Sequence, residues 1–167
     1  GLATGNSVVL RNNGGNDLTV GANGAVTCSS APTHGAAGAG TVFTQPTTPS
    51  QTCVVTNGSG NIAGANVTNV GVACTTNTYT IGGTVAGLAT GNSVVLRNNG
   101  GNDLTVSANG AFTFTAPVAD GAAYAVTVFT QPSAPTQNCV VTSGSGTIAG
   151  ANVSNVTVTC TTTTFTV

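Results

Sequence analysis

Apolar and polar residues alternate along most of the chain, and this alternation predicts β-strands. Residues 123–132, AYAVTVFTQP, show it most clearly, and in residues 156–160, VTVTC, the apolar residues fall on one face and the threonines on the other. Successive side chains of a strand point to opposite faces, so a period of two is typical of a strand with one buried face. Apolar residues do not recur at helical spacing, and the pattern predicts an all-β chain.

Seven such segments lie between residues 78 and 162, and turn signals separate them. Asn-Gly-Gly-Asn at residues 99–102 and Ala-Asn-Gly at residues 108–110 are two of these signals. Short strands at this spacing are typical of a β-sandwich. The predicted strands are TYTIGGTVAG, NSVVLRN, DLTVSA, AFTFTA, AYAVTVFTQP, NCVVTS and NVTVTCT.

The chain contains this pattern twice. Residues 1–20 recur unchanged as residues 87–106, a shift of 86, and at that shift residues 1–81 align with residues 87–167 without a gap. Only 23 of the 81 aligned pairs differ. Self-similarity of this kind predicts two tandem domains of one fold. We place the first at 1–77 and the second at 78–162, with a surplus strand at 163–167.

The two copies differ at their ends and in the volume of their predicted cores. Because Gly1 aligns with Gly87, the first domain lacks a counterpart of residues 78–86, its predicted first strand. Four large residues of the second copy are also replaced by smaller ones, which leaves cavities that cost a few kcal/mol each. We therefore expect an acceptor cavity in the first domain, formed by Val26, Cys28, Gly38 and Gly40 in place of Phe112, Phe114, Tyr124 and Val126.

The surplus strand at the other end of the chain suggests what fills this cavity. Residues 161–167 match residues 75–81, which lead into the first strand of the second domain. Our hypothesis is that one subunit donates this strand to the first domain of the next, building a head-to-tail filament of a single protein. The alternative is that the 167 residues are a window from a longer tandem array, in which the adjoining repeat supplies the strand. The donor strand consists of Thr163, Thr164, Phe165, Thr166 and Val167.

The motifs G-T-V-x-G-L, V-V-L, N-G-A-F-T-F and D-G-A-A-Y-A-V-T-V follow one another in the second copy. This order resembles the prealbumin-like β-sandwich repeats of bacterial surface proteins, a group that includes carboxypeptidase-regulatory-like and Cna-B-like domains. The resemblance implies two seven-stranded Ig-like (prealbumin-like) domains and a stalk or scaffold role on a secreted or surface protein of bacteria. Cna-B-like domains often carry a Lys–Asn isopeptide bond, which is impossible here because the chain has no Lys.

The cysteines predict a different covalent link. Cys53 and Cys74 are 21 residues apart, as are Cys139 and Cys160, and each pair brackets the last two strands of its copy. A hairpin folded near residues 63–64 or 149–150 sets the two thiols opposite each other on the inward face. A disulfide closing such a loop contributes roughly 3 kcal/mol; the alternative is a buried pair of free thiols. Disulfides imply an oxidising compartment and hence an extracellular location.

Cys28 is left without a partner. It matches Phe114 of the second copy, and we favour its interpretation as a small core residue. The alternatives are an intermolecular disulfide and a reactive thiol.

The charge content narrows the choice of partners. Charged residues make up 3% of the chain and the formal net charge is −1, so binding of nucleic acid through counterion release is not expected. No apolar run approaches the roughly 20 residues of a membrane span, and a near-zero net charge favours self-association.

The charged residues also predict two ion pairs. Arg11 with Asp17, and Arg97 with Asp103, flank an Asn-Gly-Gly turn and are expected to pair across it as surface ion pairs.

We expect no catalytic site, no metal site and no cofactor. His34, the only histidine, corresponds to Asp120 and is predicted to lie in an exposed turn without a nucleophile and acid beside it. One pair of thiols in each copy, without a second pair and with one His in the chain, cannot build a tetrahedral zinc site. One carboxylate per turn is a poor calcium site. Four glycosylation sequons are interpreted as turn and strand residues, at Asn57, Asn66, Asn152 and Asn155.

Two functions of other classes stay open. A carbohydrate- or protein-binding module is disfavoured by the absence of Trp and by Phe residues that mostly occupy predicted core positions. The other is an accessory domain of a large secreted enzyme.

Overall fold

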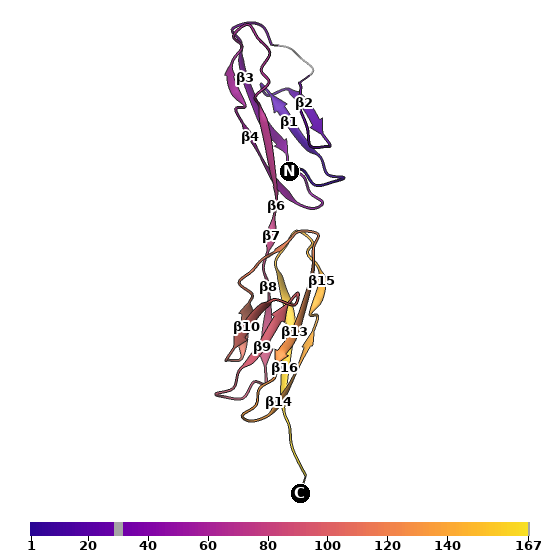
Figure 1. The fold of residues 1–167 in the computed structure, drawn as a ribbon, viewed down its shortest axis with the longest axis vertical. Helices are drawn as coiled ribbons and strands as arrows, with labels where there is room; N and C mark the ends of the chain where they lie inside the picture. The colour runs from indigo at the N-terminus through magenta and orange to yellow at the C-terminus, as the bar shows by residue number, and fades with distance from the viewer. Residues whose placement is uncertain (29–31, 167) are drawn as a thin grey trace. The chain divides into compact units, whose positions relative to one another are not determined.

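The computed structural model describes residues 1–28 and 32–166, and these residues form strands but no helix (Figure 1). The all-β prediction is therefore confirmed. The chain divides into two compact units, unit 1 at Gly1–Asn77 and unit 2 at Thr78–Val167.

Unit 2 contains two four-stranded sheets and a short two-stranded one. The first sheet has the order β10-β9-β13-β15 and is antiparallel. The second has the order β11-β8-β16-β14, in which β8 and β16 run parallel, and β7 pairs with β12. The strands are β7 (Thr78–Tyr79), β8 (Ile81–Ala86), β9 (Val94–Asn98), β10 (Asn102–Val106), β11 (Gly110–Thr113), β12 (Val118–Ala119), β13 (Ala123–Thr130), β14 (Gln137–Thr142), β15 (Ser145–Thr147) and β16 (Val153–Thr162).

The core of unit 2 draws on both four-stranded sheets. Leu96 and Val126 of the first sheet belong to the same buried cluster as Ile81 and Val156 of the second. The rings of Phe112 and Phe114 add an edge-to-face contact with centroids 5.9 Å apart. Two sheets that bury one face each in a shared core are consistent with a β-sandwich.

Unit 1 repeats the first sheet of unit 2 but only part of the second. Its sheets have the orders β2-β1-β3-β5 and β4-β6. Shifted by 86, the strands of the larger sheet coincide with β10, β9, β13 and β15, and β4 coincides with β14. Among the described residues, β8 and β11 have no counterpart strand in unit 1. The strands are β1 (Val8–Asn12), β2 (Asn16–Val20), β3 (Ala37–Thr44), β4 (Gln51–Thr56), β5 (Ser59–Asn61) and β6 (Gly71–Thr76).

The short strands β5 and β15 correct one detail of the sequence prediction. The last two long strands of each unit do pair, β4 with β6 and β14 with β16, but they are not joined by a simple hairpin. The segment between them first leaves to pair with the larger sheet, β5 with β3 and β15 with β13.

Candidate strand-accepting groove

Unit 1 contains an open groove with a volume of about 360 Å³. One wall is the free edge of β6, which pairs with β4 on its other side. The opposite wall is the segment of residues 22–27. The groove is lined by Leu2, Val8, Val20, residues 22–27, Val67, Thr68, residues 70–72 and Cys74.

Unit 2 shows what occupies the corresponding place there. Its strand β8 lies between β16, with which it pairs in parallel, and β11, with which it pairs antiparallel. The residues of β16 and β11 that pair with β8 can be compared with the residues 86 positions earlier in unit 1. All of these counterparts line the groove, except the counterpart of Thr159. The groove is therefore the position of β8, open in unit 1.

Side-chain amides hold the first residues of the chain at one end of this groove. The ammonium nitrogen of Gly1 donates to the carbonyl of Cys74 at 2.8 Å. The side-chain amide of Asn23 accepts from the N–H of Leu2 and donates to the C=O of Leu2, both at 2.8 Å. Gln51 Oε1 accepts from the N–H of Ala3 at 2.9 Å.

The same clamp in unit 2 shows which end of the groove this is. Asn109 bonds both main-chain groups of Leu88 at 2.8 Å, and Gln137 Oε1 accepts from the N–H of Ala89 at 2.9 Å. The two residues held by this clamp, Leu88 and Ala89, follow shortly after the end of β8 at Ala86. Gly1 accordingly stands where the chain leaves β8 in unit 2.

Identical side chains show how unit 1 is affected by the open groove. Val156 and Val158 are fully buried in unit 2, whereas their counterparts Val70 and Val72 are only partly buried. Val67 is 51% exposed. The groove thus presents valine side chains to solvent next to an unpaired strand edge.

The residues of the predicted acceptor cavity do not all lie in the groove. Val26 lines it. Gly38 and Gly40 lie on β3, in the other sheet, where the carbonyls of Gly60 and Gly58 are close to them. Cys28 is exposed and unpaired, so its interpretation as a core residue is wrong.

The predicted donor segment projects from the end of unit 2, after β16 (Figure 1). The N–H of Thr163 donates to the carbonyl of Thr136 at 2.9 Å. Residues 163–166 are outside any strand and exposed, Phe165 by 83%. Val167 lies outside the described residues. Tyr79, the counterpart of Phe165, packs partly buried against the core of unit 2, which shows the environment that a residue at this position takes when its strand is docked.

Both expected disulfides are formed, Cys53–Cys74 and Cys139–Cys160. In each unit the two cysteines are directly opposite in the strand register, and their side chains are buried in the core. Such bonds are compatible with an oxidising compartment.

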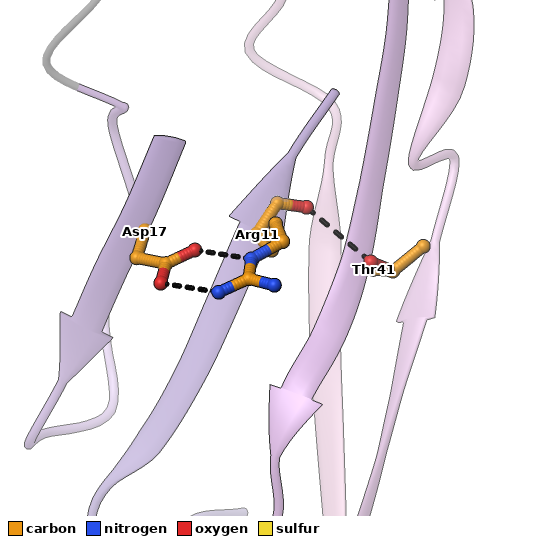
Figure 2. Close-up of polar contacts among 3 residues, drawn as sticks. All are labelled: Arg11, Asp17 and Thr41. Atoms are coloured by element: carbon orange, nitrogen blue, oxygen red, sulfur yellow. Dashed lines mark hydrogen bonds and ion pairs between the residues drawn. The ribbon is translucent and has the colours of Figure 1, made fainter. Parts of the chain in front are cut away.

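Both ion pairs also form, each across a hairpin. Arg11 donates to both carboxylate oxygens of Asp17, at 2.6 and 2.7 Å. Figure 2 shows these two bonds, and it also shows the Arg11 carbonyl accepting from the hydroxyl of Thr41. The hydrogen bonds from Arg11, together with its charge, hold the pKa of Asp17 below its ordinary value. The guanidinium carbon also lies 3.3 Å from the ring centroid of Phe43, a cation–π contact.

Unit 2 repeats this arrangement. Arg97 donates to Asp103 at 2.6 and 2.8 Å, and the pKa of Asp103 is lowered by the same contact. Its guanidinium carbon lies 3.3 Å from the ring centroid of Phe129.

No match is found among family models, curated proteins or solved structures.

The remaining residues considered from the sequence are mostly where they were expected. His34 is exposed in a turn, and the four sequon asparagines are exposed. Asp120 is different, because it is buried and accepts from the N–H of Gly150 at 2.7 Å. The turn that contains it is therefore not the freely exposed one that the His34–Asp120 alignment predicted.

Within residues 1–28 and 32–166, no three His, Cys, Asp or Glu side chains gather as a metal site. The same residues contain no helix that could cross a membrane.

Proposed function

We propose that this chain is a structural subunit of an extracellular bacterial filament or surface stalk, in which a strand from a neighbouring subunit completes unit 1. The observation that carries the proposal is the groove beside β6, which coincides with the place of β8 in unit 2. One sequence thus presents the same fold with this strand in place and with its place open.

The physical reasons for association lie in the groove itself. An open strand edge offers main-chain N–H and C=O groups to an added strand, which supply affinity, while side-chain pockets supply specificity. Val67, Val70 and Val72 provide apolar surface that an added strand would remove from water, at about 25 cal/mol per Å². With a net charge of −1, electrostatic repulsion between copies is small.

The donor in this proposal is residues 163–167 of another copy. This segment follows the last strand of unit 2 and is exposed. It carries Phe165 in the place of Tyr79, whose ring packs against a core. Because donor and acceptor are different surfaces of one chain, the contact is head-to-tail and continues into a fibre.

A second candidate is a segment of a longer tandem-repeat stalk, in which the adjoining repeat of the same polypeptide supplies the strand. The position of Gly1 favours it, because a residue joined to its ammonium nitrogen would stand at the end of the groove. The two candidates share the acceptor groove, and they differ in whether the added strand belongs to another molecule or to the same polypeptide.

A binding module for carbohydrate or protein gains one observation from the structure. Phe112 and Phe114 are buried, but Phe165 is exposed, and Phe43 and Phe129 are 55% and 54% exposed. The prediction that the Phe residues mostly lie in the core is therefore wrong, and Phe43 and Phe129 are the exposed rings outside the donor segment. However, the guanidinium of Arg11 or Arg97 already lies over each ring. That stacking leaves less aromatic face for a sugar, and we favour the structural role.

Negative-stain electron microscopy of the purified, non-reduced protein tests the proposal. The full chain is compared with a version that ends at Thr162, where β16 ends. Filaments from the full chain but not from the shortened one are the expected result. If both remain as separate particles, donation by residues 163–167 is wrong and the tandem-stalk candidate takes its place.

A further inference from the structure

We infer that the groove of unit 1 selects one kind of strand: an apolar–Gly–Gly–Thr–Val–Ala segment from another repeat of this kind, running parallel to β6. The inference rests on the part of the proposed function that both candidates share, the addition of a strand to unit 1, and it specifies the sequence and register of the strand that fills the groove. It follows from the way β8, whose residues 81–86 read IGGTVA, is seated in unit 2.

The pairing of β8 fixes which groove residue each position would meet. Gly83 pairs with Val156 on one side and with Phe112 on the other, and their counterparts in unit 1 are Val70 and Val26. Both of these residues line the groove. The centre of the added strand therefore crosses the groove between these two valines.

Only glycine fits at this crossing in unit 2. A Cβ atom at Gly83 would overlap the carbonyl group of Val156, and one at Gly82 would overlap the carbonyl oxygen of Phe112. In both cases the obstacle is main chain, which cannot rotate away as a side chain can. A strand with larger residues at these two positions must shift away from β6 or from residues 24–27, and so lose pairing with one of them.

The flanking positions require apolar side chains. Ile81 and Val85 are buried in the core of unit 2. Val85 pairs with Val158 and Gly110, whose counterparts Val72 and Gly24 line the groove. Thr84 and Ala86 are exposed, so these two positions carry little of the selection.

This requirement sets a limit on what residues 161–167 contribute. Aligned at the shift of 86, Val167 corresponds to Ile81, and no residue of that segment corresponds to Gly82 or Gly83. The segment provides a counterpart of β7 and the first apolar anchor. The groove beyond that anchor is shaped for the glycine pair and the second anchor of a β8-type strand.

An extension of the chain tests this selection. Residues 78–86, TYTIGGTVA, are added in front of Gly1, where the clamp of Gly1 and Leu2 directs the chain into the groove. Tethering gives the strand a high effective concentration, so weak intermolecular affinity does not obscure the result. A matched extension carries Gly82→Val and Gly83→Val in the added copy, and a third carries the sequence of residues 161–167.

The melting temperature and the hydrogen exchange rates of unit 1 are measured for each extension, and unit 2 serves as the internal control. The glycine-containing extension is expected to raise the melting temperature of unit 1 and to slow hydrogen exchange of the β6 amides by about tenfold or more. The valine extension should leave both near the values of the unextended chain. Placing Val26→Asp in the groove should cancel the gain, whereas Val54→Asp, on the exposed face of β4, should not.

The outcomes separate this inference from the proposed function. Equal gains from the glycine and valine extensions would overturn the glycine selection and leave strand addition standing. A larger gain from residues 161–167 than from TYTIGGTVA would overturn the assignment of the strand. If no extension changes unit 1, the inference is wrong, and filament formation by the unextended chain then decides the proposed function separately.

Discussion

At the scale of single residues, the two copies form an internal comparison in which identical side chains meet different surroundings. Val70 and Val156 occupy equivalent positions, yet only Val156 is fully buried. The difference comes from β8, which covers Val156 in unit 2. Burial is thus set by the neighbouring strand and not by residue type. The ion pairs, by contrast, depend on one hairpin each and are the same in both units.

The Arg11–Asp17 pair makes the titration of Asp17 a direct probe of that hairpin. Arg11 lowers the pKa of Asp17 in the folded protein, so the pair stabilises the fold above the unfolded-state pKa and loses this effect as the pH falls through the folded-state value. Replacing Arg11→Gln removes both the hydrogen bonds and the charge that lower this pKa, so the pKa of Asp17 should rise toward its ordinary value. Carboxyl NMR titration measures it, and Asp103 is the control because Arg97 still pairs with it. An unchanged pKa of Asp17 would contradict the pairing.

Gln137 is a buried polar residue whose removal should be costly. Its amide accepts from Ala89 N and Asn92 Nδ2 and donates to the Gly87 carbonyl and the Thr162 hydroxyl. Gln137→Ala removes these four hydrogen bonds, although Asn92 Nδ2 keeps its bond to the Pro135 carbonyl and the exposed Gly87 and Thr162 can bond water instead. A buried group left without a partner costs about 1–3 kcal/mol. We expect unit 2 to lose at least about 2 kcal/mol of stability, measured by denaturant unfolding.

The neighbouring exposed residue provides the control for that measurement. Asn138→Ala, one position along β14 and on the opposite face, should change the free energy of unfolding by less than about 0.5 kcal/mol. Similar losses from both variants would mean that the buried amide is not a special contributor.

At the scale of strands, the alternating pattern predicted the long elements well because each has one buried face. It missed β5 and β15, since Ser59–Asn61 contains no apolar residue and Ser145–Thr147 contains none either. These strands form because they lie beside β3 and β13. The parallel pairing of β8 with β16 was also beyond prediction, because it joins segments about 70 residues apart by contacts that leave no local signal.

The candidate site was predictable only in outline. The missing counterpart of residues 78–86 and the smaller residue at Val26 both pointed to a void in unit 1. Gly38 and Gly40 were assigned to it because they are in phase with the core. The phase of a residue tells which face of the strand it lies on, but not which part of the core that face covers. Gly38 pairs with Gly60 of β5, and the N–H of Gly40 donates to the carbonyl of Gly58, just before β5.

The open edge of β6 should be visible in hydrogen exchange. In unit 2, β16 is paired on both sides, with β8 and β14, whereas among the strands of residues 1–28 and 32–77 β6 pairs only with β4. Amides of β6 that face the groove should exchange at least about tenfold faster than their counterparts in β16. Amides of β4 and β14 have equivalent partners and serve as the reference for the overall stability of each unit. Equal protection of β6 and β16, after that correction, would mean that the edge is already covered.

At the scale of the whole molecule, the two units differ in the size of their cores. Among the residues that the structure describes, the buried cluster of unit 2 has fifteen members and that of unit 1 has five. A fully buried aliphatic or aromatic side chain contributes about 1.5–3 kcal/mol, so unit 1 is the less stable of the two. In the proposed assembly, the added strand would complete the less stable unit.

This difference predicts two thermal transitions, of which the lower belongs to unit 1. Gln51→Ala removes the buried amide of unit 1 that corresponds to Gln137 and should lower only the first transition, by about 4–8 °C for each kcal/mol lost. Gln137→Ala should lower only the second. Differential scanning calorimetry measures both, and a single transition shifted by either variant would contradict the assignment.

The concentration dependence of the lower transition separates the two candidate assemblies. If residues 163–167 of one molecule complete unit 1 of another, the folded unit is stabilised by mass action, by up to about 1.4 kcal/mol for each tenfold rise in concentration. The lower melting temperature should then rise with concentration while the upper one stays fixed. The chain ending at Thr162 has no donor and should show no such rise. A lower transition independent of concentration in the full chain would contradict donation by residues 163–167 and leave the tandem-stalk candidate, in which the strand is covalently attached and its effective concentration does not depend on dilution.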